Sequence, residues 1–302
     1  MTRRGWLLFA AMGFIWGIPY LLIKVAVGDL SPASLVFLHT GIGALILVPV
    51  AAMRGNLGVL RPYWKPVLLY TLVEVAVPWF LLADAERRLS SSFTGLLIAA
   101  VPLVGAVLAW RTGAADRLDR RRVGGLLMGF FGVAALLGLN VAVRDFGAVG
   151  EVLFVSLGYA VGPMIIARRL GAVPAVGVVA ASLGVTALIY APVGLVQMPH
   201  HVPSAAVIGS VVALGVVCTA LAFVIFFALI TEVGPVRATV ITYINPAVAL
   251  GLGVVLLREP LTVGILVGFA LILAGSFVAN RQDTKPHDLR LDPLPDGLES
   301  AR

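Results

Sequence analysis

Long apolar runs separated by short polar stretches dominate the pattern of this chain. No Asp, Glu, Lys or Arg occurs between Arg169 and Glu232, which is room for at least two bilayer crossings at roughly 20 residues each. Each run is expected to be a helix, because hydrocarbon offers the backbone no hydrogen-bond partners and the runs are about twice as long as barrel strands. The pattern predicts an all-α multi-pass membrane protein with ten transmembrane helices, at 6–27, 32–53, 66–86, 91–110, 123–140, 148–167, 174–196, 204–230, 236–257 and 262–280.

Composition excludes several other classes of protein. Hydrophobic residues make up 60% of the 302 residues and charged residues only 12%, so a soluble globule is excluded. The single cysteine, Cys218, cannot form an intramolecular disulfide, and no His or Cys cluster has metal-ligand spacing. The net charge of +7 comes from basic residues between apolar runs, without a nucleic-acid-binding motif. We therefore expect no metal, no cofactor and no nucleic-acid partner.

The positions of the basic residues predict the orientation in the membrane. If the N-terminus is inside, the inner segments contain all of the 22 Lys and Arg residues except Lys24, Arg87, Arg88, Arg144 and Arg258. This bias predicts that both termini are cytoplasmic, in a multi-pass protein of the plasma (inner) membrane. Frequent Arg with only three Lys indicates a GC-rich bacterial genome. Residues 281–302 are polar and contain proline without a helical apolar period, so they are predicted to form a disordered cytoplasmic tail.

An internal repeat divides the remaining chain into two parts. Equivalent residues lie 143 positions apart, among them Trp16 and Tyr159, Pro49 and Pro192, Ala85 and Ala228, Asp116 and Glu259, Gly125 and Gly268, and Gly132 and Gly275. The repeats are predicted at residues 1–140 and 141–280. Five spans per repeat is an odd number, so the second copy must enter the membrane from the opposite side. Two inverted five-helix repeats are typical of transporters that expose a midplane site to each side in turn.

Three motifs in the second half resemble a known family. Residues 240–246 (VITYINP), 257–262 (LREPLT) and 268–275 (GFALILAG) are similar to the end of an EamA domain, the repeat unit of the drug/metabolite transporter superfamily. The resemblance extends over nearly all of residues 6–280. It implies a ten-helix secondary transporter, often an exporter of amino acids or other small metabolites.

Two titratable residues are candidates for substrate binding or coupling. Glu74 lies near the middle of the third span, where a charged carboxylate costs on the order of 3 kcal/mol, so it should face the interior of the bundle. Desolvation favours its neutral form, which suits either a proton-coupling group or a site for a substrate ammonium. The alternative is a structural Glu that is hydrogen-bonded to a neighbouring helix. His39 in the second span is the other candidate, because the reference pKa of histidine, about 6.5, permits switching at physiological pH, although packing alone would also explain it.

Aromatic residues inside the spans suggest the walls of a cavity. Such residues could present polar tips to a small solute, although helix packing would also explain them; they are Trp16, Tyr20, Trp79, Tyr159 and Tyr243. Asn245 lies beside Pro246 and is a further candidate for the cavity. Prolines inside spans each remove a backbone hydrogen bond and are candidate hinges or static kinks; they are Pro19, Pro78, Pro102, Pro163 and Pro246.

Charges near the predicted outer surface receive simpler explanations. Asp84, Glu86, Arg87 and Arg88 are expected to be solvated at a helix end. Lys24 either pairs with Asp29 or extends its ammonium to the surface.

No P-loop, dinucleotide fingerprint or protease motif occurs, which argues against ATP-driven transport within this chain and against an enzyme. The predicted partners are the lipid bilayer, a small-molecule substrate and, as the candidate coupling ion, protons. The alternatives are a membrane sensor or assembly subunit that binds a ligand without moving it, and an intramembrane enzyme. The sequence does not predict the oligomeric state.

Overall fold

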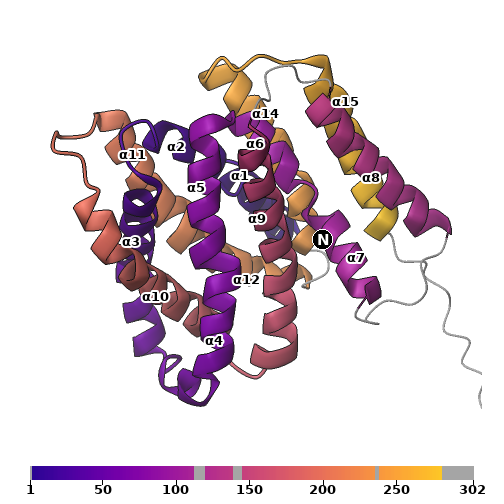
Figure 1. Cartoon of the computed structure of the whole chain (residues 1–302). Helices are drawn as coiled ribbons and strands as arrows, with labels where there is room; N and C mark the ends of the chain where they lie inside the picture. The colour runs from indigo at the N-terminus through magenta and orange to yellow at the C-terminus, as the bar shows by residue number, and fades with distance from the viewer. Residues whose placement is uncertain (1, 112–119, 139–144, 235–237, 281–302) are drawn as a thin grey trace, which may run out of the picture.

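The computed structural model describes residues 2–111, 120–138, 145–234 and 238–280, and this part of the chain is all-helical, as predicted (Figure 1). The first half contains α1 (Arg3–Ile15), α2 (Pro19–Ala26), α3 (Pro32–Met53), η1 (Gly58–Tyr63), α4 (Trp64–Tyr70), η2 (Thr71–Ala76), α5 (Val77–Arg88), α6 (Ser91–Ile98), α7 (Val101–Arg111) and α8 (Arg120–Gly138). The second half contains α9 (Phe146–Ile165), η3 (Ile166–Leu170), α10 (Ala175–Val196), α11 (Ala205–Ala213), η4 (Leu214–Leu221), α12 (Ala222–Val233), η5 (Thr239–Tyr243), α14 (Asn245–Leu256) and α15 (Val263–Asn280). The predicted tail at 281–302, and Asp116 of the repeat, lie outside the described residues.

Eight continuous helical segments among the described residues are long and apolar enough to cross a bilayer. They coincide with the first eight predicted spans, so the prediction of a multi-pass membrane protein is confirmed. Two shorter apolar helices, Val240–Leu256 and Val263–Ala279, coincide with the predicted ninth and tenth spans. The count of ten crossings and the inverted orientation stay predictions.

Most spans are not single straight α-helices. Pro19 begins α2 after a break, Pro78 and Pro246 stand at the starts of α5 and α14, Pro102 is the second residue of α7, and Pro163 lies in α9 just before the π segment η3. A proline has no N–H to donate, which is tolerated in the first turn of a helix but interrupts the hydrogen bonding that would continue a preceding helix. All five candidate hinges therefore lie at or beside an irregularity, although their motion is untested.

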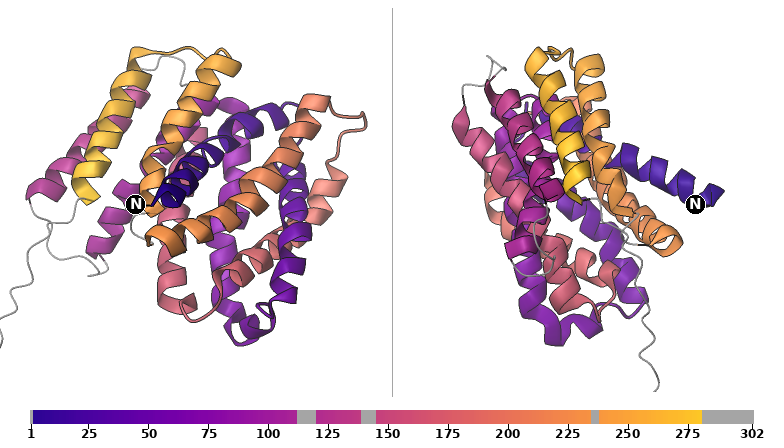
Figure 2. Two further views of the ribbon diagram at one scale, coloured as in Figure 1. Left: turned by 180° about the vertical axis from the view of Figure 1, so that it is seen from behind. Right: turned by 90° about the vertical axis from the view of Figure 1, so that its right-hand side faces the viewer.

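Helices from the two halves pack against each other in pairs. Helix α3 packs on α10, α6 on α14, and α8 on α15. The α8–α15 pair lies at one side of the molecule, seen on the right in Figure 1 and from behind in Figure 2. The α3–α10 and α8–α15 pairs correspond under the predicted 143-residue offset, and α6 and α14 lie in the corresponding predicted spans 91–110 and 236–257. Each pair joins the first half of the chain to the second.

Glycines permit the closest of these contacts. A Cβ added at Gly125 would lie 2.8 Å from the Gly275 carbonyl oxygen, and one at Gly268 would lie 3.0 Å from the Gly132 carbonyl oxygen. The two contacts correspond to each other under the 143-residue offset. Backbones without Cβ atoms between them can approach closely, which is a general way for membrane helices to associate.

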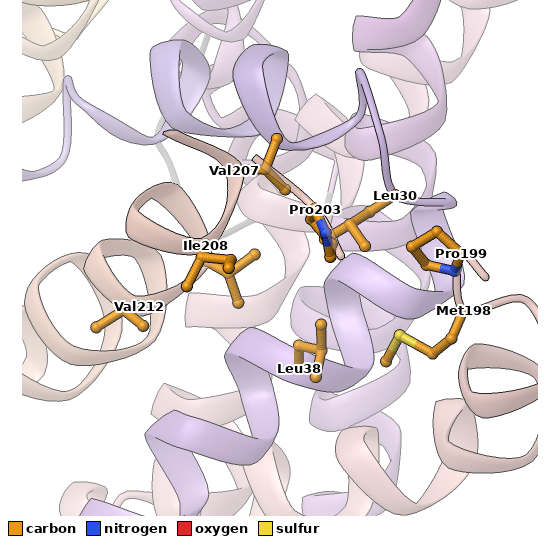
Figure 3. Close-up of a pocket in the computed structure, with 9 residues that line it drawn as sticks. Leu30, Leu38, Met198, Pro199, Pro203, Val207, Ile208 and Val212 are labelled. Carbon is orange, nitrogen blue, oxygen red and sulfur yellow. The ribbon is translucent and has the colours of Figure 1, made fainter. Parts of the chain in front are cut away.

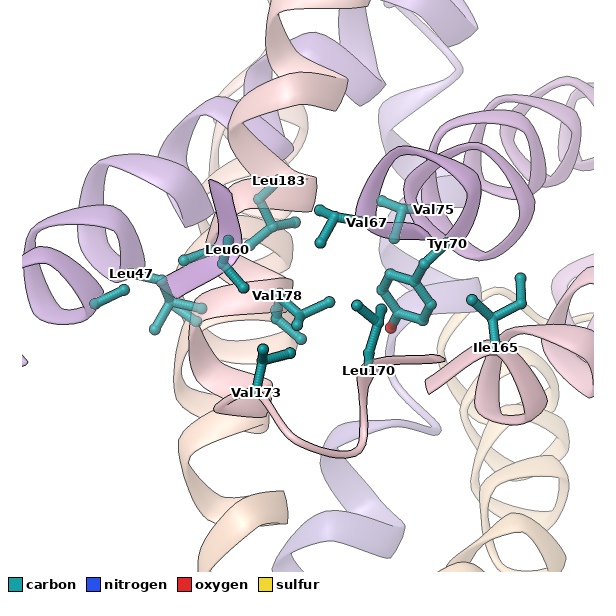
Figure 4. Packing of buried hydrophobic residues seen from close by; sticks show 14 residues of the cluster. Leu47, Leu60, Val67, Tyr70, Val75, Ile165, Leu170, Val173, Val178 and Leu183 are labelled. Atoms are coloured by element: carbon teal, nitrogen blue, oxygen red, sulfur yellow. The ribbon is translucent and has the colours of Figure 1, made fainter. Parts of the chain in front are cut away.

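A large apolar cluster fills the end of the bundle where α4 and η3 lie (Figure 4). Leu47 of α3, Leu183 of α10 and Leu170 of η3 are each at most 1% exposed. Tyr70 lies among these aliphatic side chains and is also buried. This end of α4, immediately before Glu74, is therefore held firmly by packing.

Candidate substrate site

Glu74 lies in η2, a π-helical segment between α4 and α5. The wider turn of a π-helix weakens the regular hydrogen-bond ladder and is frequent at functional sites. Pro78 follows four residues later and cannot donate to that ladder. The sequence therefore builds an irregular turn at the position of its most deeply placed acidic candidate.

The Glu74 carboxyl points at helix α9. Gly162 of α9 approaches it so closely that a Cβ at residue 162 would overlap Oε2 and lie 2.6 Å from Cδ. Oε2 is buried and has no hydrogen-bond partner among the described residues. A buried polar atom without a partner costs on the order of 1–3 kcal/mol, so this oxygen is a ready acceptor for a proton or a donor group.

A chain of side-chain contacts connects this position to His39 through Tyr159 and Trp79. His39 of α3 stacks on Trp79 of α5 with 5.0 Å between ring centroids, and its Nδ1 lies 2.8 Å from the Leu35 carbonyl oxygen. Tyr159 of α9 interacts with the Trp79 side chain and lies within electrostatic range of Glu74 and Tyr20. The structure thus brings together Glu74, His39, Trp79, Tyr159 and Tyr20, from α2, α3, η2, α5 and α9.

The other three candidates hold a different group of helices. Trp16 packs against Phe223 and Phe226 of α12, with centroids 5.9 and 4.7 Å away. The Tyr243 hydroxyl donates to the Ser276 carbonyl oxygen at 3.2 Å. With its amide oriented to satisfy both groups, Asn245 donates to the carbonyl oxygens of Gly13 and Ile241, each at 3.0 Å. These contacts join α1, α12, η5, α14 and α15, which favours a packing role for the three residues.

A second buried polar cluster, at the end where α5 turns into α6, was missed by the sequence analysis. Glu86 is 0% exposed, so the expectation that it is solvated was wrong. Lys24 does not pair with Asp29; its Nζ donates to the carbonyl oxygens of Glu86 at 2.6 Å and Leu89 at 2.7 Å. Glu259 accepts the backbone N–H groups that begin α6. Glu86 was misjudged because a charge near a helix end resembles a loop charge when the packing of other helices is unknown.

An exposed ion-pair network lies beside this cluster. Arg88 at the end of α5 contacts Asp84 at 2.5 Å, Asp145 at 3.0 Å and Glu151 at 2.7 Å. Asp145 also accepts the Ala148 N–H at 2.9 Å and so caps α9. Both contacts favour the charged carboxylate, which holds the pKa of Asp145 below its usual value of 3.8. The network ties the end of α5 to the start of α9.

Two apolar cavities lie away from the predicted residues. One, of about 310 Å³, is lined by Leu30, Leu38, Val207 and neighbouring residues between α3 and α11 (Figure 3). The other, of about 330 Å³, is lined by Phe14, Val248 and Leu252 with other residues of α14. Neither includes Glu74 or the side chains around it.

Comparisons with known proteins agree with this architecture. A multi-pass helical bundle with an acidic residue buried among its spans is typical of membrane transporters. The sequence profile of the EamA-like transporter family matches residues 3–138 and again residues 148–281. The chain therefore belongs to the EamA-like transporter family, and its resemblance to that family is confirmed.

The individual relatives of the chain share a low sequence identity with it. The chain is similar to the uncharacterized transporter YvbV of Bacillus subtilis (strain 168), with 24% identity over 91% of this chain and 90% of the relative. It is also similar to an uncharacterized transporter of Archaeoglobus fulgidus, with 24% identity over 92% of this chain and 99% of the relative. A solved crystal structure shares the fold, with a TM-score of 0.66 and 24% identity over 93% of this chain and 97% of the other.

Proposed function

We propose that the chain is a secondary-active exporter of small metabolites such as amino acids, which works by alternating access and is driven by protons. In this proposal both termini lie in the cytoplasm, and the chain spans the plasma membrane. The observation that carries the proposal is the Glu74 carboxyl, whose buried Oε2 lacks a partner among the described residues within a cluster of aromatic side chains. A carboxyl at this depth can exchange a proton for a substrate ammonium group.

Matching irregularities in the two halves support the alternating-access part of the proposal. The π segment η2 begins at Thr71 and the π segment η4 begins at Leu214, which are equivalent positions under the 143-residue offset. Thr2 and Asp145 are also equivalent, and each caps the first helix of its half. These correspondences favour two copies of one five-helix unit, at 1–140 and 141–280, that are inverted relative to each other and move against each other around the Glu74 site.

The proposal is tested with purified protein in sealed vesicles. A thermal-shift screen of amino acids first selects a solute, because a ligand that binds only the folded state raises the melting temperature. We expect the parent protein to show both counterflow and proton-driven flux of that solute. Glu74→Gln should keep counterflow and lose proton-driven flux, because the amide cannot release a proton. Glu232→Gln, at a half-buried carboxylate that accepts from the Thr2 hydroxyl, should keep both.

The alternatives give different results in the same assay. Binding without flux in the parent protein would support a membrane sensor or assembly subunit instead. Chemical conversion of the solute would support an intramembrane enzyme. Proton-driven flux at the parent rate in Glu74→Gln would remove Glu74 from the coupling mechanism.

A further inference from the structure

We propose that Glu86 binds a proton that keeps the α5–α6 end of the bundle closed, and that Lys24 is the group that responds when this proton leaves. This inference rests on the proposed transport function, because it assigns a gate to one side of the transporter. With the N-terminus inside, this end faces the exterior. The site is distinct from Glu74, which lies about three helical turns, or about 18 Å, away in the same span.

Three helical regions and a connecting segment meet at this site. Lys24 comes from the last turn of α2, Glu86 from the last turn of α5, Ser91 from the first turn of α6, and Glu259 from the link between α14 and α15. Glu86 and Ser91 are 0% exposed. This end of the bundle is therefore packed closed, with polar groups inside the closure.

Two of the three charged side chains have partners on the backbone. The Lys24 ammonium donates to two carbonyl oxygens at the end of α5, those of Glu86 and Leu89. The Glu259 carboxylate accepts from the N–H groups of Ser91 and Ser92 at 2.7 and 2.9 Å. These are the ends of helices at which a cation and an anion, respectively, are stabilised by the helix dipole.

The Glu86 carboxyl is the third of these charged side chains, and it has no such backbone partner in the part of the chain that the structure describes. Neither of its oxygens has a hydrogen-bond partner among the described residues, and both are buried. The titratable and charged groups that act on it are Lys24 and Tyr20 from α2 and Glu259 from the α14–α15 link. With one ammonium and two carboxyls, the cluster is neutral only when one carboxyl holds a proton. Glu259 already has two N–H donors for its charge, so the proton belongs on Glu86.

Loss of this proton changes what Lys24 must bind. The Glu86 carboxyl releases a proton to the outer solution and becomes a buried carboxylate, which is strongly unfavourable unless it is paired. The Lys24 ammonium keeps its three protons and moves its hydrogen bonds from the two backbone carbonyl oxygens to the carboxylate. Lys24 then still holds α5 through the Glu86 side chain, but the Leu89 carbonyl oxygen at the turn between α5 and α6 loses its ammonium donor, and this turn can open. A single proton therefore controls access from the exterior.

The test measures opening directly, without a substrate. A cysteine is placed at Thr94, which is 0% exposed and lies one turn further into α6, in a Cys218→Ala background, and an impermeant maleimide is added outside. The labelling rate of this cysteine is divided by the labelling rate in the same protein carrying Glu86→Gln. The division cancels the pH dependence of the thiol itself. We expect this ratio to rise by up to about tenfold per pH unit, because opening releases one proton. Glu232→Gln, a carboxylate at another helix end, should leave the ratio unchanged.

Infrared spectra and a second variant complete the test. We expect the parent protein to show the C=O band of a protonated carboxyl that is missing in Glu86→Gln. If Glu86→Gln does not fold, the same labelling is measured in Lys24→Gln. The cysteine at position 94 should then react rapidly at every pH, with only the pH dependence of the thiol itself remaining. A flat ratio, slow labelling of Lys24→Gln, or a ratio that follows sodium rather than pH would overturn the inference. A normal labelling response in a protein without counterflow would refute transport and leave the proton site in place.

Discussion

The closest contact at the candidate site is between Gly162 and the Glu74 carboxyl, and it gives a graded prediction for three glycines of one helix. In Gly162→Ala the new methyl overlaps Oε2 of Glu74, which is the far end of a flexible side chain and can move away. In Gly158→Ala the methyl meets the Val73 carbonyl oxygen and lies 3.0 Å from Pro78 Cγ, so backbone must shift. In Gly150→Ala nothing lies within 4 Å.

The expected change in the free energy of unfolding of each variant follows from two opposing effects. Replacing Gly by Ala inside a helix stabilises by up to about 1 kcal/mol, whereas forcing an extra methyl into packed surroundings costs about 1–3 kcal/mol. Gly150→Ala should therefore stabilise, Gly162→Ala should be near neutral, and Gly158→Ala should destabilise by about 2 kcal/mol. Because only Gly162→Ala displaces the carboxyl without disturbing the backbone, it should retain folding and lose proton-driven flux.

Equilibrium unfolding in detergent and flux in vesicles measure the two effects separately. The packing argument fails if Gly158→Ala is as stable as Gly150→Ala. The assignment of the site fails if Gly162→Ala is folded and transports with the parent pH profile.

Three further predictions use the same measurements. Trp79→Leu should lower stability by about 1 kcal/mol more than Trp79→Phe, because only Phe can keep an aromatic contact with His39; equal losses would show that the stack contributes nothing. Gly275→Ala should lower the unfolding free energy by about 2 kcal/mol, since its methyl would meet backbone atoms of α8, and a neutral result would contradict the tight α8–α15 contact. The pKa of Asp145 is lowered by folding, so its stabilising effect is complete above pH 3.8 and is lost as the pH falls below that value. Asp145→Asn should therefore be less stable than the parent at neutral pH, with the difference shrinking in acid; a constant difference would refute the charged cap.

Hydropathy predicted the spans well because the bilayer allows few alternatives to a long apolar helix. Glu74 and His39 became candidates for a related reason, since a polar group at that depth must face other helices, and their role in binding stays a prediction. The same logic did not separate Trp16 and Asn245 from Tyr159, because position along a span does not reveal which neighbouring helix a side chain meets. Burial of Glu86 depends on α2 and on the distant Glu259, and no local pattern records such contacts.

The π segments could not be predicted either, since no residue type marks a widened turn. Thr71–Ala76 and Leu214–Leu221 share little sequence apart from apolar character, and of the two only η2 has a proline, Pro78, two residues after its end. The difference between α and π hydrogen bonding is set by packing on both sides of the helix.

The widened turn at η2 makes the number of residues in this span a functional property. A π turn accommodates one residue more than an ordinary turn, and one residue corresponds to a rotation of about 100° around the helix axis. Deleting Val73 would let the span return to regular α-helical winding. The deletion would also rotate either the segment before it or the segment after it around the helix axis. Trp79 and Tyr70 could then no longer face their present neighbours at the same time. A shortened chain could therefore insert into the bilayer with its helices intact and still have lost the arrangement of side chains around Glu74.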